Sequence, residues 1–183
     1  MYRIKKDKRT ESSAAKICNG LVVCMRDKKF SSIRVAEIAA ASGVSRATFY
    51  RIFDTPHDVL VYICDSLAED LAGSISIKTI KDKEEISLKA LIYLTEHADE
   101  LSVVFKSGRT DLIQQALEPY SERIAPGMEQ MFSRKELDYA RISIASLFVG
   151  ILYVWESRGR KERPREVLAI FKKFSIAANQ SIL

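Results

Sequence analysis

Hydrophobic residues recur at a spacing of three and four positions through most of the chain, and no sustained alternation of apolar and polar residues is present. The first such stretch covers about residues 7–28, where one stripe of a helix collects Ala14, Ile17, Leu21, Val22 and Met25. The same spacing predicts further helices over about 35–41, 45–52, 55–72, 84–98, 99–107, 109–131, 134–158 and 164–181, about nine in all. The pattern therefore predicts an all-α protein.

Helix-start and helix-stop residues support these boundaries. Thr55 and Pro56 predict an N-cap and a first helical position, and Asp58 suits the positive end of the same helix. Ser133 with Glu136 has the spacing of a capping box before a long apolar helix. Gly159 and Pro164 predict where that helix stops and the last one starts, and the stretch 73–83 is expected to be a loop. Pro119 and Pro126 are expected to kink or divide the predicted helix over 109–131.

The segment 35–60 carries the most specific pattern in the chain. It predicts a short helix, a tight turn at Gly43, a second short helix and then a capped third helix. That order is typical of a helix-turn-helix, whose second helix enters the major groove of DNA. We therefore expect a three-helix DNA-binding head over 1–54 and a helical regulatory and dimerisation body over 55–183.

A helical wheel of the segment 45–52 and the residue after it separates two faces. One face is apolar, with Phe49, Ile52 and Phe53, and it would anchor the helix. The opposite face offers groups that contact nucleic acid, either at base edges or at phosphates. We assign DNA contacts on this helix to Ser45, Arg46, Ala47, Thr48, Tyr50 and Arg51. Ser45 is also the expected N-cap, where exposed N–H groups suit a phosphate.

The charge distribution agrees with this assignment. Residues 1–60 hold 12 Lys and Arg against 6 Asp and Glu, whereas residues 61–183 hold 17 against 18. The whole positive excess of the chain, +5, therefore lies around the predicted DNA-reading segment. A cluster of cations attracts a polyanion such as DNA.

The order I-A-x-x-x-G-V-S-x-x-T-F-Y-x-x-F, from Ile38 to Phe53, resembles the TetR/AcrR family of bacterial transcriptional regulators. Phe30, Ile33 and Val35 match as well, and the resemblance covers about residues 7–70; the segment from Trp155 to Pro164 is similar to the last helix-to-helix turn of some members. It implies a DNA-binding head on a helical body that dimerises through its last two long helices and often holds a small-molecule pocket. It also implies that Arg46, Ala47 and Thr48 lie near bases, and that Arg34, Tyr50 and Arg51 lie near phosphates.

The chain departs from this family pattern at two positions. Ile52 stands where His or Tyr is common, and Pro56 stands where a phosphate-contacting Lys is common. We expect His57 to replace part of the lost contact. The basic N-terminal arm, with Lys5, Lys6, Lys8 and Arg9, is expected to supply the rest. The remaining alternative for the whole segment is a packed helical hairpin without a DNA-binding role.

The helix predicted over 134–158 is apolar all round instead of along one stripe. A second subunit covering one side explains this pattern, and a large intramolecular core is the alternative. We expect a homodimer interface that includes Ile144, Phe148, Ile151, Trp155, Phe171 and Phe174. The longest apolar stretch, 142–155, is too short to span a bilayer, so no membrane association is expected.

A small-molecule pocket is harder to predict, because aromatic and Met residues at helical spacing also build plain cores. Candidate lining residues are Tyr93, His97, Phe105, Tyr120, Met128 and Met131. No cofactor or metal is expected, since the chain has two His and lacks metal-binding or nucleotide-binding motifs. The odd count of three cysteines, Cys18, Cys24 and Cys64, argues against a disulfide framework and favours the cytoplasm. They are expected to be buried, with a redox sensor as the alternative.

These observations favour a homodimeric transcriptional regulator that reads a palindromic operator in double-stranded DNA. A repressor released by a small-molecule effector is the leading hypothesis, and a DNA-binding regulator controlled by a protein partner is the alternative. An enzyme is not expected, because the acidic pairs Glu84–Glu85 and Asp99–Glu100 stand at predicted helix starts, where dipole effects explain them.

Overall fold

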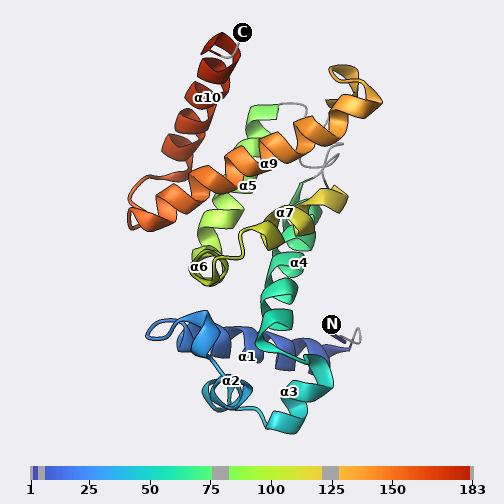
Figure 1. Ribbon diagram of the computed structural model, residues 1–183, viewed down its shortest axis with the longest axis vertical. Helices are drawn as coiled ribbons and strands as arrows, with labels where there is room; N and C mark the ends of the chain where they lie inside the picture. The colour runs from blue at the N-terminus through green and yellow to red at the C-terminus, as the bar shows by residue number, and fades with distance from the viewer. Residues whose placement is uncertain (1, 4–6, 76–82, 121–127, 182–183) are drawn as a thin grey trace. The chain divides into compact units, whose positions relative to one another are not determined.

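The computed structural model describes residues 2–3, 7–75, 83–120 and 128–181. Within these ranges the regular structure is entirely helical, with nine α-helices and short 3-10 turns (Figure 1). This confirms the all-α fold predicted from the sequence. The chain divides into two compact units, one of residues 1–66 with 99–112 and the other of residues 67–98 with 113–183.

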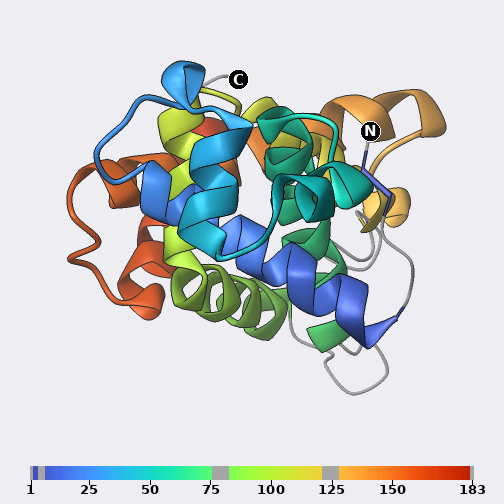
Figure 2. The same cartoon turned by 90° about the horizontal axis from the view of Figure 1, so that it is seen from below.

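The first unit begins with α1 (Lys8–Cys24), α2 (Val35–Ser42) and α3 (Arg46–Ile52). Asp7 caps α1, because its Oδ1 accepts a 2.9 Å hydrogen bond from the backbone N of Thr10. Figures 1 and 2 both show α2 lying across α1. The two backbones approach so closely at Gly20 that a Cβ there would stand 2.8 Å from the carbonyl oxygen of Ile38. This glycine therefore sets the distance between α1 and α2.

Helix α1 is shorter than the sequence predicts, because it ends at Cys24 and not near residue 28. After Met25 the chain continues with four charged residues over 26–29, and none of them offers an apolar side chain to bury. Lys28 instead forms an ion pair with Glu37 in the first turn of α2. A 3-10 turn, Phe30–Ser32, then leads toward α2.

The start of α4 (Pro56–Ser74) follows the sequence prediction. The hydroxyl of Thr55 accepts a bond from the backbone N of Asp58 at 3.3 Å, and the Asp58 carboxylate accepts one from the backbone N of Thr55 at 2.9 Å. These reciprocal bonds satisfy two backbone donors at the beginning of the helix. Helix α4 runs through the division between the two compact units, at residues 66 and 67, whereas the predicted domain boundary stands at residues 54 and 55.

Helices α5 (Lys83–Glu96), α6 (Ala98–Ser107) and α7 (Asp111–Leu117) follow. The helix predicted over 109–131, with a kink or division at its prolines, is divided: α7 ends at Leu117 and gives way to a 3-10 turn, Glu118–Tyr120. The division at Pro119 is as predicted, since proline has no N–H to continue the helical ladder. Pro126 lies outside the described residues, and a further 3-10 turn spans Met128–Gln130.

Helices α9 (Arg134–Ser157) and α10 (Pro164–Ser181) complete the second unit, where α10 packs against α5 and α9 (Figure 1). The Ser133 backbone N donates to Glu136 Oε2 at 2.8 Å, as the predicted capping box requires. Gly159 has a φ of 82°, in the left-handed region that ends many helices, and Pro164 opens α10 as predicted. Arg160 fixes this turn, because its guanidinium contacts the Glu156 carboxylate and the Ala98 carbonyl oxygen.

Candidate nucleic-acid interface

The apolar face of α3 is fully buried within the first unit. Phe49, Ile52 and Phe53 each have a relative exposure of 0%. The rings of Phe49 and Phe53 lie 5.8 Å apart, and Tyr62 of α4 lies 5.7 Å from Phe53. The buried face predicted from the helical wheel is therefore confirmed, and it fixes the rotation of α3 about its axis.

That rotation leaves the polar side of α3 in solvent. Arg46, Ala47 and Arg51 are exposed, and Tyr50 is 46% exposed. None of the three polar side chains has a hydrogen bond or ion pair in the described part of the chain. Two guanidinium groups, a phenol and a small residue thus share one free surface, which is the set of groups that contacts base edges and phosphates.

The turn that precedes α3 is built as the sequence predicts. Gly43 has a φ of 66°, which favours glycine, and the backbone N of Val44 donates to the carbonyl oxygen of Ala39 at 3.1 Å. Ser45 caps α3, since its Oγ accepts a 3.0 Å bond from the backbone N of Thr48. The hydroxyls of Ser45 and Thr48 also lie 3.0 Å apart, so these two predicted DNA contacts are hydrogen-bonded to each other.

The start of α2 carries a further exposed cation, Arg34, close to the ion pair of Lys28 and Glu37. Arg34 is exposed, and its backbone N donates to Glu37 Oε2 at 2.8 Å. The hydrogen bond from Lys28, together with the one from the Arg34 backbone, lowers the pKa of Glu37 below its ordinary value. The ammonium group of Lys28 is therefore paired with Glu37, whereas the guanidinium of Arg34 remains at the surface.

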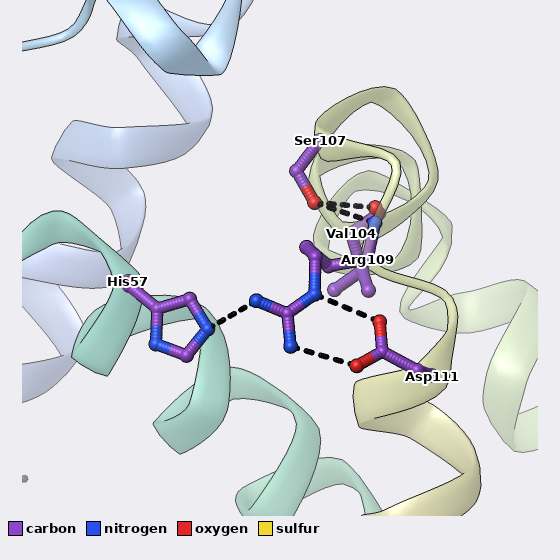
Figure 3. Close-up of polar contacts among 5 residues, drawn as sticks. All are labelled: His57, Val104, Ser107, Arg109 and Asp111. Atoms are coloured by element: carbon purple, nitrogen blue, oxygen red, sulfur yellow. Dashed lines mark hydrogen bonds and ion pairs between the residues drawn. The ribbon is translucent and has the colours of Figure 1, made fainter.

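His57 does not join the exposed set, although the sequence analysis assigned it to DNA contact. Its ring is half-buried, and Nε2 lies 2.6 Å from Nη1 of Arg109 (Figure 3). Arg109 is in turn paired with Asp111, with Nη2 and Oδ2 2.7 Å apart. The expectation that His57 replaces a lost phosphate contact is corrected, because the ring is directed at the turn between α6 and α7. Sequence reasoning missed this pairing because the two residues stand 52 positions apart.

The beginning of the N-terminal arm is attached to the first unit. Tyr2 donates from its hydroxyl to Asp65 Oδ2 at 2.6 Å, and its ring contacts Tyr62 and Phe53. The backbone N of Arg3 donates to the Ile52 carbonyl oxygen at 2.8 Å, at the end of α3. Lys8 and Arg9 are exposed on α1, while Lys5 and Lys6 lie outside the described residues. The role of this arm in DNA binding stays a prediction.

The predicted pocket residues fall into different surroundings. Phe105 is buried in the first unit, whereas the other five belong to the second unit. Tyr93 and His97 are half-buried and stack with ring centroids 4.4 Å apart, Tyr120 is half-buried and Met128 is 9% exposed. Met131 is 70% exposed, so its assignment to a cavity is corrected.

The predicted dimer face is partly exposed in the chain. Ile144 is 40% and Phe174 57% exposed, while Ile151 is half-buried. Phe148 and Phe171 contact each other across α9 and α10, with centroids 5.8 Å apart. Trp155 is removed from this face, because it is 7% exposed and its Nε1 donates to the Glu162 carbonyl oxygen at 2.9 Å.

Helix α9 is also long and apolar enough, by length and composition alone, to cross a membrane. Its most apolar window has a mean hydropathy of 1.5, and 11% of that window is buried. The apolar run at 142–155, which is shorter, lies within this helix. One helix of this kind is weak evidence for a membrane location, because helices of soluble proteins pass the same test.

Cys64 is buried as predicted, whereas Cys18 and Cys24 are half-buried. Burial raises the pKa of the Cys18 and Cys64 thiols to about 12, and it also raises the pKa of Cys24. A thiol that stays protonated is a poor nucleophile, so these residues behave as small apolar groups. Among the described residues, no group of three or more His, Cys, Asp and Glu side chains is placed to hold a metal ion.

No protein-family model matches the chain, and no curated protein sequence matches it either. Solved structures do match over almost the whole length. A TetR-family transcriptional regulator from Syntrophomonas wolfei has a TM-score of 0.71 at 19% identity, covering 94% of this chain and 97% of its own. The fatty acid degradation regulator FadR from Bacillus halodurans has a TM-score of 0.66 at 21% identity, covering 95% and 96%.

A TetR transcriptional regulator from Streptococcus agalactiae gives a TM-score of 0.64 at 17% identity, with 92% of this chain and 96% of that one covered. The likeness thus extends through both compact units and well beyond the helix-turn-helix segment. The chain has the fold of TetR-type transcriptional regulators.

Proposed function

We propose that this protein is a sequence-specific DNA-binding transcriptional regulator that acts as a homodimer. The observation that carries the proposal is the division of α3 into a fully buried apolar face and an exposed face with Arg46, Tyr50 and Arg51. A short helix anchored in this way presents its polar side chains to the major groove. The likeness to TetR-type regulators in fold, and the positive charge of residues 1–60, support the same function.

The exposed residues take different roles in this proposal. Arg46 and Ala47 lie near base edges, where an arginine offers two parallel donors to guanine and alanine permits close approach. Thr48 lies beside them, at the capped start of α3, together with Ser45. Tyr50, Arg51 and Arg34 contact phosphates and set the orientation of the head on the duplex.

The homodimer forms through α9 and α10. Ile144, Ile170 and Phe174 expose 40%, 39% and 57% of their surface, and Ile151, Phe148 and Phe171 are half-buried beside them. Covering such side chains removes apolar surface from water, which stabilises a protein interface. A two-fold dimer of this kind reads a palindromic operator, because its two heads meet equivalent half-sites.

Control by a small-molecule effector completes the proposal, with the protein acting as a repressor. The half-buried Tyr93, His97 and Tyr120, with the buried Met128, are the residues of the second unit proposed to contact the effector. An effector releases DNA only if it binds more tightly to a conformation that fits the operator poorly. In the alternative, a protein partner provides this control.

The test is fluorescence anisotropy of the purified protein on the duplex upstream of its own gene, against a scrambled duplex of equal length. At about 150 mM salt we expect a preference of at least about 10³-fold for the native duplex. Arg46→Ala should weaken native-duplex binding by at least about tenfold. Arg165→Ala, which removes an exposed cation from α10, is the matched control and should leave binding unchanged. Failure to bind either duplex at low salt would contradict the proposed function.

A further inference from the structure

His57, Arg109 and Asp111 form a chain of polar contacts inside the first unit (Figure 3). The Asp111 carboxylate accepts bonds from both Nε and Nη2 of Arg109, at 2.8 and 2.7 Å. This two-point contact fixes the plane of the guanidinium. Nη1 is left directed at Nε2 of His57, 2.6 Å away. The three residues thus connect the first turn of α4 with the turn between α6 and α7.

The chemistry of arginine sets the state of the imidazole. A guanidinium is always protonated and only donates, so Nε2 of His57 accepts the hydrogen bond from Nη1. An imidazole that accepts a hydrogen bond at Nε2 carries its proton on Nδ1. A proton added at Nε2 would remove the acceptor and place two cations against each other. The contact in Figure 3 is consequently compatible with one charge state of His57 alone.

Other charged groups also lie close to this contact. The hydrogen bond from Arg109 lowers the pKa of Asp111, and the same bond raises the pKa of Arg109. On the side of α4, the Asp58 carboxylate accepts from the backbone N of Thr55, and Asp54 pairs with Arg3. Histidine is the side-chain type among these whose charge ordinarily changes between about pH 5 and 8.

The position of His57 relates this contact to the reading helix. His57 is the second residue of α4, and only residues 53–55 separate α4 from the end of α3. Phe53 in this link is fully buried, and Thr55 and Asp58 cap the first turn of α4. A shift of that turn is therefore transmitted to α3 over a short and well-packed connection.

We propose that His57, Arg109 and Asp111 form a proton-sensitive contact that positions α4 and, through it, the DNA-reading helix α3. The proposal rests on the DNA-binding function proposed above. At neutral pH the contact holds the first turn of α4 against the turn between α6 and α7. On acidification a proton from solvent binds Nε2, the contact opens, and α4 gains freedom that operator binding must then remove. Acid thus lowers the preference for operator over other DNA.

The contact itself is tested without DNA, by ¹⁵N NMR of the imidazole rings in the full-length protein. The chain has two histidines, so the signals of His57 are assigned by comparison with His97→Gln. At about pH 7.5 we expect a neutral His57 ring that carries its proton on Nδ1. A ring that carries its proton on Nε2 would overturn the proposal, because Arg109 cannot accept a hydrogen bond.

The coupling is tested by the anisotropy experiment repeated at about pH 7.5 and pH 5.5. The wild type should lose at least about fivefold of its preference for the native duplex on acidification. His57→Gln keeps an acceptor for Arg109 without a titrating ring, so its preference should not change with pH. His57→Lys carries a permanent cation and should have a reduced preference at both pH values, with circular dichroism confirming that it is folded.

The outcomes separate this proposal from the proposed function. Equal binding of both duplexes by every variant at about pH 7.5 would contradict the proposed function, and the coupling with it. A native-duplex preference that the wild type keeps at both pH values would overturn this proposal alone. So would a loss of preference in His57→Gln as large as that of the wild type.

Discussion

Helices α3 and α9 differ in how far their apolar residues are buried. In α3, Phe49 and Ile52 have no exposed surface, and the polar side alone faces solvent. In α9, Tyr139 and Ile142 are 72% and 58% exposed, while Val149 and Leu152 of the same helix are buried. Helix α3 thus buries its apolar face within its own chain, whereas α9 leaves apolar surface exposed to water.

This difference indicates which kind of partner suits each region. The exposed side of α3 is polar and basic, so its natural partner is a polyanion that accepts hydrogen bonds. The exposed sides of α9 and α10 include large apolar side chains such as Tyr139, Ile142 and Phe174. These suit a matching apolar surface, which a second copy of the chain would supply in the homodimer proposed above. If the two regions depend on separate partners, a change in one should leave the other intact.

The largest expected effect comes from the buried face of α3. Phe49→Ala removes a fully buried ring and should lower the free energy of unfolding by about 3–5 kcal/mol. Urea denaturation followed by circular dichroism measures this change. Loss of the ring leaves a cavity beside Phe53, so DNA binding should disappear together with the fold of the head.

Tyr50→Ala is the matched control, because Tyr50 neighbours Phe49 but is 46% exposed. It should cost about 1 kcal/mol of stability or less, mainly through the lost edge contact with Phe49. Its affinity for DNA should nevertheless fall. Equal destabilisation by the two substitutions would contradict the division of α3 into an anchoring face and a reading face.

The second prediction concerns the apolar face of α10. Phe174→Asp places a carboxylate on a side chain position that is 57% exposed in the single chain, so the fold should tolerate it. If two copies meet there, a buried charge without a partner should prevent dimerisation. Light scattering after gel filtration should then give the 20.7 kDa mass of one chain, against twice that mass for the wild type.

Lys173→Asp, at the neighbouring exposed position, is the control for the added charge and should remain dimeric. For Phe174→Asp, the helix content and the midpoint of urea denaturation should show whether the head is still folded. A wild-type protein that elutes as one chain at micromolar concentration would remove the dimer from the proposal.

The smallest expected effect lies at the start of α2 and depends on pH. The pKa of Glu37 is lowered in the folded state, chiefly by the hydrogen bond from Lys28. The unfolded chain protonates Glu37 at a higher pH than the folded chain does. The stabilisation from the contact between Lys28 and Glu37 is therefore present above the ordinary glutamate pKa, and it is lost as pH falls through the pKa of the folded state. Glu37→Gln should therefore reduce stability at pH 7, and the difference from the wild type should shrink as pH falls below the ordinary glutamate pKa.

The control for that measurement is Glu69→Gln, an exposed glutamate on α4. Its stability should follow the wild type over the whole pH range in urea denaturation. A difference between Glu37→Gln and the wild type that stays constant down to pH 3 would exclude the charge of Glu37 as its cause.

Local signals in the sequence predicted the helices and their ends well. Gly43, Ser45, Thr55 and Pro164 occupy the turn and cap positions assigned to them, because these depend on a few neighbouring residues. The segment 109–131 is divided at Pro119, as predicted, because proline lacks the N–H that continues the helical backbone ladder.

The roles of single side chains were less predictable. His57 was placed on the DNA side, although it pairs with Arg109, and Trp155 was placed at a subunit interface, although its own chain buries it. Met131 was placed in a cavity, although it lies in solvent. The partner of His57 stands 52 positions away, and a pattern with a period of 3.6 residues contains no information on such a contact.

Hydrophobic spacing and caps are local properties, so the sequence predicted the helical class, the turn of the helix-turn-helix and the two faces of α3. Which polar groups of the first unit remain available was settled only when its helices packed, in the tertiary structure. It attached Arg109 to His57, paired Lys28 with Glu37 and left Arg46, Tyr50 and Arg51 in solvent. The physical reason is that a side chain's partners are set by distances in space, and those distances exist only once the helices have packed.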